Sequence, residues 1–92
     1  MEFEWDPVKA AANKRKHGIA FEVAESVFYD PLALMEPDHI VDHEERWRAI
    51  GLADNFAVLV VAHVHRSSEG TEIIRIISAR KATQSERKRY EQ

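Results

Sequence analysis

The side chains with the clearest chemical potential stand at the end of an isoleucine-rich segment. Arg80 and Lys81 close that segment and lie directly before a predicted helix. An arginine held at a strand end beside a helix N-terminus is well placed to bind phosphate, because its planar guanidinium donates two parallel hydrogen bonds. The two residues therefore predict an anion site. Because Arg80 ends a strand, we expect its replacement to cost little core packing.

Three histidines and a tyrosine offer proton transfer. His17 follows Lys14, Arg15 and Lys16 at a predicted helix end, where it acts either as a cap or as a general acid or base beside a basic patch. His63 and His65 share one side of a predicted strand. They could bind a metal or transfer protons, but no acidic third ligand is in clear register, and a structural role is the alternative. Tyr90 either docks the last helix or, beside the arginines there, stacks on a base or transfers a proton.

The net charge of −3 hides a segregation of sign. Residues 21–45 hold eight acids and no Lys or Arg, whereas residues 9–16 hold four cations and no acid. Six further cations lie within residues 75–89: Arg75, Arg80, Lys81, Arg87, Lys88 and Arg89. If the two basic stretches meet, they form a positive face suited to a polyanion or an acidic partner. The alternative is that these charges are merely solvated.

Three helices are predicted to position these groups. Asp6 and Pro7 form a start signal for a helix over Val8–His17, which Gly18 ends. A second helix is predicted over Phe21–Phe28, from the apolar face that alternates with glutamates. The last helix begins at a capping box in which Thr83 and Glu86 bond to each other's backbone amides.

Strands are predicted between the second and the last helix, after a short strand at residues 3–5. The segments are Leu32–Met35, Arg46–Leu52, Phe56–His65 and Thr71–Arg80, with a loop at Pro37–Glu45, a two-residue turn at Asp54-Asn55 and a turn at Arg66–Gly70. The isoleucine-rich Thr71–Arg80 reads as a central strand buried on both faces. The order β-α-α-β-β-β-β-α predicts an α+β domain with helices packed on an antiparallel sheet.

The two arginines of the last predicted strand are expected to lie on opposite faces of the sheet. Arg75 and Arg80 are an odd number of residues apart, so they point to opposite faces unless a bulge intervenes. Arg75 stands among isoleucines and either pairs with an internal carboxylate or has a function of its own.

Length and composition exclude several classes of protein. The 92 residues allow one domain, and 45% apolar with 32% charged residues is an ordinary globular balance. The chain has no Cys, so disulfides and thiolate sites are excluded. No apolar run spans a bilayer and no signal core is present, so we expect a cytoplasmic protein. The glycines stand too far apart for a phosphate loop, and we expect no cofactor.

An ordered set of residues runs from Phe3 to Tyr90 and resembles the BrnT family of bacterial toxins from type II toxin–antitoxin modules. The set comprises Phe3-Glu4-Trp5-Asp6-Pro7 with Lys9 and Asn13, Lys16-His17-Gly18, Phe21-Glu22 with Ala24 and Phe28, Glu45-Arg46-Trp47-Arg48-Ala49-Ile50-Gly51, Ile74-Arg75-Ile76-Ile77-Ser78-Ala79-Arg80-Lys81-Ala82, and Glu86-Arg87 with Tyr90. Ala20 stands where family members usually carry a capping residue, so we expect a weak start to the second helix.

The resemblance implies a RelE-like fold and a ribonuclease that inhibits translation without metal. It also implies a BrnA-type antitoxin that neutralises the toxin. The toxin is then expected to reach operator DNA only through this antitoxin. For catalysis we expect Arg80 and Lys81 at the phosphate, with Arg66 as a further candidate. His17 is the first choice for proton transfer and Tyr90 the second. Lys14, Lys16 and Arg87 are expected to bind RNA.

Two other functions use the same residues. A non-catalytic binding module would dock an acidic partner or nucleic acid on the basic face. A degenerate toxin would keep the fold and the antitoxin but not the activity. Cleavage of a defined RNA separates the toxin from both.

Overall fold

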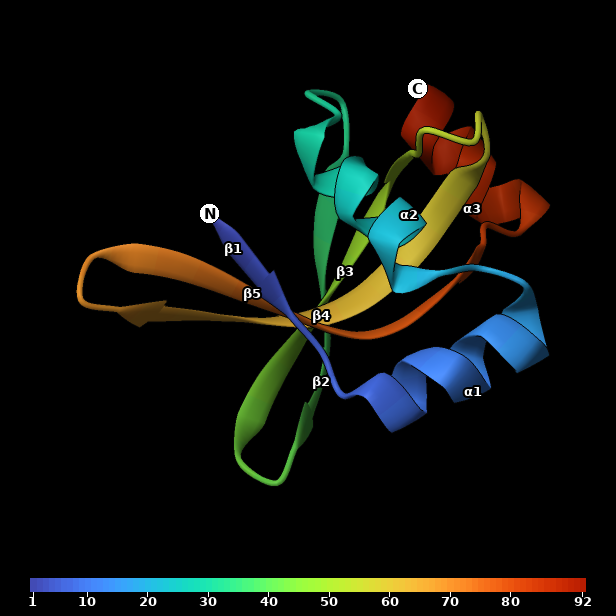
Figure 1. The fold of residues 1–92 in the computed structure, drawn as a ribbon. Coiled ribbons are helices and arrows are strands. Elements are labelled where there is room, and N and C mark those ends of the chain that lie inside the picture. Colours follow the sequence, from blue (N-terminus) through green and yellow to red (C-terminus); the bar gives the residue numbers. More distant parts are fainter.

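A five-stranded sheet organises the chain, and the computed structural model describes all of residues 1–92 (Figure 1). The elements are β1 (Glu2–Glu4), α1 (Pro7–His17), α2 (Phe21–Glu25), the 3₁₀ turn η1 (Ser26–Tyr29), β2 (Leu34–Val41), β3 (Glu44–Leu52), β4 (Val58–Ser68), β5 (Thr71–Lys81) and α3 (Gln84–Glu91). Strands β2 to β5 form the predicted antiparallel meander. The sheet is nevertheless mixed, because β1 pairs in parallel with β5. The α+β prediction is confirmed.

The predicted helix ends are confirmed. Asp6 accepts a hydrogen bond of 2.8 Å from the Val8 amide, and Gly18 ends α1 in the left-handed conformation with φ 72°. Thr83 and Glu86 make both bonds of the capping box at the start of α3. Ala20 provides no side-chain cap, and the second helix lasts only to Glu25 before it tightens into η1. No helix is long and apolar enough to cross a membrane.

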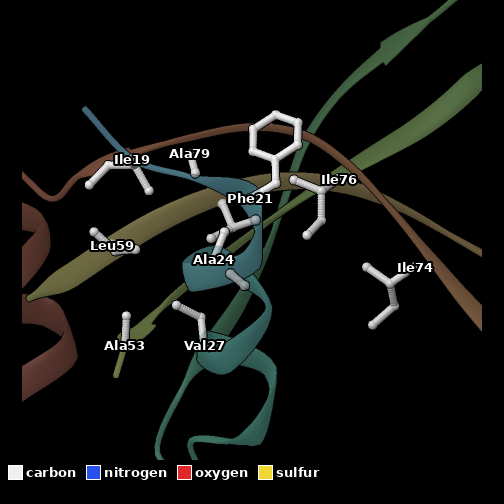
Figure 2. Close-up of a cluster of buried hydrophobic side chains, with 11 residues drawn as sticks. Ile19, Phe21, Ala24, Val27, Ala53, Leu59, Ile74, Ile76 and Ala79 are labelled. Atoms are coloured by element: carbon white, nitrogen blue, oxygen red, sulfur yellow. The ribbon is translucent and has the colours of Figure 1, made fainter. Parts of the chain in front are cut away.

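The sheet has two unlike faces. On the face that we call the helix face, Phe21 and Ala24 of α2 and Val27 of η1 pack against strand residues such as Leu59 and Ile76 (Figure 2). On the other, which we call the open face, a smaller cluster lies at one end. It comprises Ile50, Val58 and Val60, with Leu34, Ala82 and Tyr90 packed against it. The C-terminal helix α3 thus covers only part of the open face.

The predicted loop at Pro37–Glu45 is wrong. Strands β2 and β3 continue through it and turn at Asp42 and His43, whose φ values are 50° and 64°. This tip projects away from α2 (Figure 1), so neither face is covered and both carry polar residues. The apolar alternation that would reveal a strand is therefore missing.

Both ends of β4 also differ from prediction. Strand β4 begins at Val58 rather than Phe56, because the Ala53 amide bonds to the Ala57 carbonyl and closes a five-residue loop instead of a two-residue turn. Its other end runs to Ser68, so only Glu69 and Gly70 form the turn before β5. Strand β5 lies inside the sheet between β1 and β4, as predicted, but it is buried on one face only, through Ile74, Ile76 and Ala79.

A bulge in β5 decides which side chains share a face. Ala62 of β4 pairs with Ser78 while the next residue, His63, pairs with Ile76, so Ile77 is an extra residue in β5. Arg75 then lies opposite Val64 and Arg80 opposite Val60. Val60 and Val64 are an even number of positions apart, so their side chains lie on the same face of β4. The arginines opposite them therefore both point to the open face.

A buried asparagine fastens α1 to the edge of β5. The Asn13 side chain donates to the Ala79 carbonyl at 2.9 Å and accepts from the Ala79 amide at 3.1 Å. It also donates to the Ile19 carbonyl at 3.0 Å. The short β1 pairs only with residues 73–75, so the Asn13 amide makes the two bonds that a longer neighbouring strand would make.

We predict that Asn13→Ala lowers the free energy of unfolding by about 2–4 kcal/mol, because it leaves buried backbone groups of Ala79 and Ile19 without partners. The measurement is urea unfolding at pH 7, with Lys14→Ala on the exposed side of α1 as the control. Equal stability of the two variants would show that the clamp does not hold α1 in place.

Candidate functional site

Arginines surround two small residues on the open face. Glu36, Arg48, Ala62 and Ser78 form one row in register across β2 to β5. The rows on either side of it bring Arg80 opposite Val60 and Arg75 opposite Val64, each about 7 Å away along the strands. We call Arg48, Arg75 and Arg80, with Ala62 and Ser78 between them, the arginine floor. Small side chains there leave room above the sheet for the guanidinium groups.

Arg80 is held by a buried carboxylate of α3. Its two terminal nitrogens donate to the two oxygens of Glu86 at 2.7 and 3.0 Å, and Glu86 is only 7% exposed. The hydrogen bonds from Arg80 lower the pKa of Glu86 to about 2, and those to Glu86 raise the pKa of Arg80. This pair uses two of the five N–H donors of the guanidinium. Arg80 is therefore fixed in position and still has donors free.

Glu36 joins two further arginines. It accepts from Arg48 at 3.2 Å and from Arg89 of α3 at 3.0 and 3.3 Å. The Nε atoms of Arg46 and Arg48 are buried and have no partner. These two atoms are closed to solvent, so an anion on the floor would meet the terminal N–H groups of Arg48, whose side chain is 33% exposed.

Arg66 lies one row beyond Arg75 on the open face, at the end of the sheet that is far from Arg80. It opposes Ile73 near the β4–β5 turn, whereas Arg80 opposes Val60, and the two positions are about 20 Å apart along β4. Arg66 pairs with Glu4, which also lies 3.8 Å from Arg75. Lys81 opposes Leu59 and so belongs to the helix side of the sheet rather than to the side of Arg80.

His17 lies in a groove between α1 and the bulge of β5. The groove has a volume of about 230 Å³, and its lining includes Lys9, Lys16, His17, Ile77 and Ser78. Ser78 belongs to the arginine floor as well, so the floor and the groove meet at this residue. The structure thus brings Lys16 and His17 next to the strand that carries Arg80. Lys14 is exposed on α1, and Arg87 lies on α3 in a separate hollow with Lys88.

Tyr90 docks α3 on the body of the protein. Its hydroxyl donates to Asp30, and its ring packs on the cluster of Ile50, Val58 and Val60. The hydrogen bond to Asp30 raises the pKa of Tyr90. Burial alone would raise the pKa of Asp30, but hydrogen bonds from Tyr90 and the amides of Leu52 and Leu32 lower it. Tyr90 accordingly keeps its proton at neutral pH.

The pair His63 and His65 lies on the helix face. Their rings meet edge-on with centroids 4.8 Å apart, and His63 also meets Phe28 edge-on at 4.7 Å. The Val61 carbonyl can only accept, so Nδ1 of His63 carries the proton and the buried Nε2 has no partner. Burial lowers the pKa of His63 to about 4. A neutral, fully buried ring of this kind has a packing role.

The fold is that of a ribonuclease toxin of known structure. The structure superposes on the "1.1 Angstrom-resolution crystal structure of the Brucella abortus ribonuclease toxin, BrnT", with a TM-score of 0.69 and 29% identity over 91% of this chain and 99% of that one. The family described as "Ribonuclease toxin, BrnT, of type II toxin-antitoxin system" matches residues 5–86. The chain belongs to this BrnT family. No curated protein matches it.

Part of the floor escaped prediction from the sequence. Arg48 lay within a motif but had no assigned role, Arg89 counted only as one of several cations, and Glu36 only as one of several acids. The signal that would have found Glu36 and Arg48 is their register, because they oppose each other across β2 and β3; Arg89 reaches Glu36 from helix α3, which no sequence pattern indicates. That register was hidden by the missed continuation of both strands.

We predict that Arg80→Ala lowers the free energy of unfolding by about 1–3 kcal/mol, because Glu86 is left buried without its cation. The lower part of the range applies because Arg80 itself is 37% exposed. The expectation that a strand-end arginine is structurally dispensable thus overlooks Glu86. Urea unfolding measures the loss, and Arg80→Ala/Glu86→Gln should recover part of it. An Arg80→Ala protein as stable as the parent would contradict the pairing.

We predict an acid-sensitive stability that depends on His63. Its pKa is about 4 in the folded state against 6.5 unfolded, so protonation favours the unfolded chain. Up to about 3 kcal/mol should be lost as the pH falls from 6.5 toward 4. Urea unfolding across this range should show a smaller loss for His63→Asn and the parental loss for His65→Asn. Glu86 contributes only at the acid end of this range, because its pKa is 4.5 in the unfolded chain and about 2 in the folded one. A parental pH profile in His63→Asn would contradict the prediction.

Proposed function

We propose that this chain is an endoribonuclease toxin that inhibits translation by cutting RNA without a metal ion, with the arginine floor as its phosphate site. The observation that carries the proposal is the row formed by Glu36, Arg48, Ala62 and Ser78, flanked by Arg75 and Arg80. Three arginines, one from β3 and two from β5, flank a small-residue surface on one face of the sheet. The membership of the ribonuclease toxin family supports RNA as the polyanion.

The chemistry is an attack of the ribose 2′-oxygen on the adjacent phosphorus. A base removes the 2′-hydroxyl proton, the bond from phosphorus to the 5′-oxygen breaks, and that oxygen takes up a proton. The products are a 2′,3′-cyclic phosphate and a 5′-hydroxyl end. Extra negative charge develops on the phosphoryl oxygens in between, so fixed guanidinium donors accelerate the step. The carboxylates that anchor Arg80 and Arg48 keep those donors in place before RNA arrives.

We assign phosphate stabilisation to Arg80 and Arg48, with Arg75 beside them. His17 is our candidate for proton transfer, since its groove meets the floor at Ser78. The RNA on either side of that phosphate would be held by Lys14 and Lys16 of α1, Arg87 of α3 and Lys81 at the C-terminal end of β5. Tyr90 is hydrogen-bonded to Asp30, and Arg66 lies about 20 Å from Arg80 along β4, so we place neither at the reacting phosphate.

A toxin of this kind requires an inhibitor. We propose that a BrnA-type antitoxin neutralises the chain and that operator DNA is contacted only through that antitoxin. The type II toxin–antitoxin family supports a protein partner in general. An acidic segment over the arginine floor would block RNA directly and would associate faster at low salt.

We predict that Arg48→Ala reduces the cleavage rate by about 10²- to 10³-fold, the usual loss on removing one fixed donor from a developing oxyanion. The assay uses purified protein, a defined RNA and EDTA, which should leave the parental rate unchanged. Glu36 keeps Arg89 as a partner, so Arg48→Ala should remain folded.

Arg15→Ala is the matched control, because it removes the same charge from an exposed position on α1. Its rate should stay within about twofold of the parent, since exposed distant charges are screened. Equal losses in both variants would mean that overall charge, not the floor, controls the reaction. Binding of RNA with no cleavage by the parental protein would identify a binding module or a degenerate toxin instead.

A further inference from the structure

A second surface is built where the β3–β4 loop meets η1. Tyr29, Leu52 and Phe56 line a hollow of about 360 Å³ together with Ser26, Asp30, Ala53 and Asp54. Phe56 is 89% exposed and Tyr29 66%. Single exposed apolar side chains are ordinary on protein surfaces, but several that line one hollow mark an interaction site.

Phe56 is held outward against its own conformational preference. Its φ of 65° lies in the left-handed region, which is unfavourable for a bulky side chain. Hydrogen bonds impose this geometry: the Phe56 amide bonds to the Ala53 carbonyl at 3.0 Å and the Ala53 amide to the Ala57 carbonyl at 2.9 Å. The Asp54 amide is tied to Ser26 of η1 at 2.9 Å. The loop is thus preorganised, and the fold gains almost no burial from the ring that it presents.

The surroundings of the hollow are acidic. Asp54 at the rim has no side-chain partner, and Asp30 stays ionised beside Tyr90. The segments that build the hollow carry no Lys or Arg, since none occurs within residues 21–45 or 49–65. An RNA backbone would be repelled here, whereas a protein segment with cations around an apolar side chain would be complementary in both charge and polarity.

We propose that this hollow docks a partner protein through an apolar side chain flanked by Lys or Arg. The partner that we assign is the antitoxin, and this assignment rests on the proposed function. The surface is distinct from the arginine floor and opposite to it in charge. Phe56 and Tyr29 supply rigid aromatic contact area, which gives most binding energy per residue at protein interfaces.

The test is the affinity of the antitoxin encoded with this chain for two variants. Phe56→Asn removes the ring and places a residue that tolerates the left-handed region, so the melting temperature of the free protein should stay unchanged or rise. The dissociation constant should increase at least about tenfold. Val8→Asn, at a position 75% exposed on α1, is the matched control and should bind as the parent does.

Asp54→Lys adds an independent measurement. It should weaken the complex at low salt and less so at high salt, because the rim charge is screened. Parental affinity in Phe56→Asn would overturn the proposal. A dimer of the free parental chain in sedimentation, lost in Phe56→Asn, would overturn it as well, since the occupant would then be a second copy. RNA cleavage is assayed separately on the free proteins. Failure of the docking proposal is therefore seen in the binding assay, and failure of the proposed function in the cleavage assay.

Discussion

The extra residue Ile77 in β5 is the constraint on which the two-faced sheet depends. Without it, strict alternation would place Arg75 and Arg80 on opposite faces. With it, Ile74, Ile76 and Ala79 all enter the core on the helix face, and both arginines point to the open face. The same step brings Ala79 to Asn13 and Arg80 to Glu86. One inserted residue thus places the α1 clamp, the α3 anchor and the arginine floor together.

Carboxylates within the fold prepare the cationic surface. Glu86, Glu36 and Glu4 each hold one or more arginines of the open face by ion pairs. Such pairs add little stability where they are exposed, but they fix long side chains that would otherwise be mobile. They also explain how a chain of net charge −3 can present a guanidinium-rich floor. Two of the remaining acids, Asp30 and Asp54, line the hollow beside Phe56, where they favour a different kind of partner.

Local signals in the sequence were enough for much of the fold. The Asp6-Pro7 start, the Gly18 stop and the Thr83–Glu86 capping box each act within a few residues, and all three are confirmed. The continuation of β2 and β3 was missed because an uncovered hairpin tip shows no apolar alternation. The bulge was equally invisible, since it depends on how β5 pairs with β4. Site residues that depend on register, such as Arg48 and Glu36, therefore escaped, whereas Arg80 was found from its place at a strand end.

The central claim is that RNA binds on the arginine floor of the open face. The most direct measurement is NMR titration of the labelled protein with a 2′-deoxy oligonucleotide, which cannot undergo attack by a 2′-oxygen. We expect the Nε–H signals of Arg48, Arg75 and Arg80 and the backbone amide signal of Ser78 to shift together. The backbone amide signals of Tyr29 and Phe56 should stay unchanged. Shifts confined to the outer side of α3, or to the hollow beside Phe56, would contradict the account.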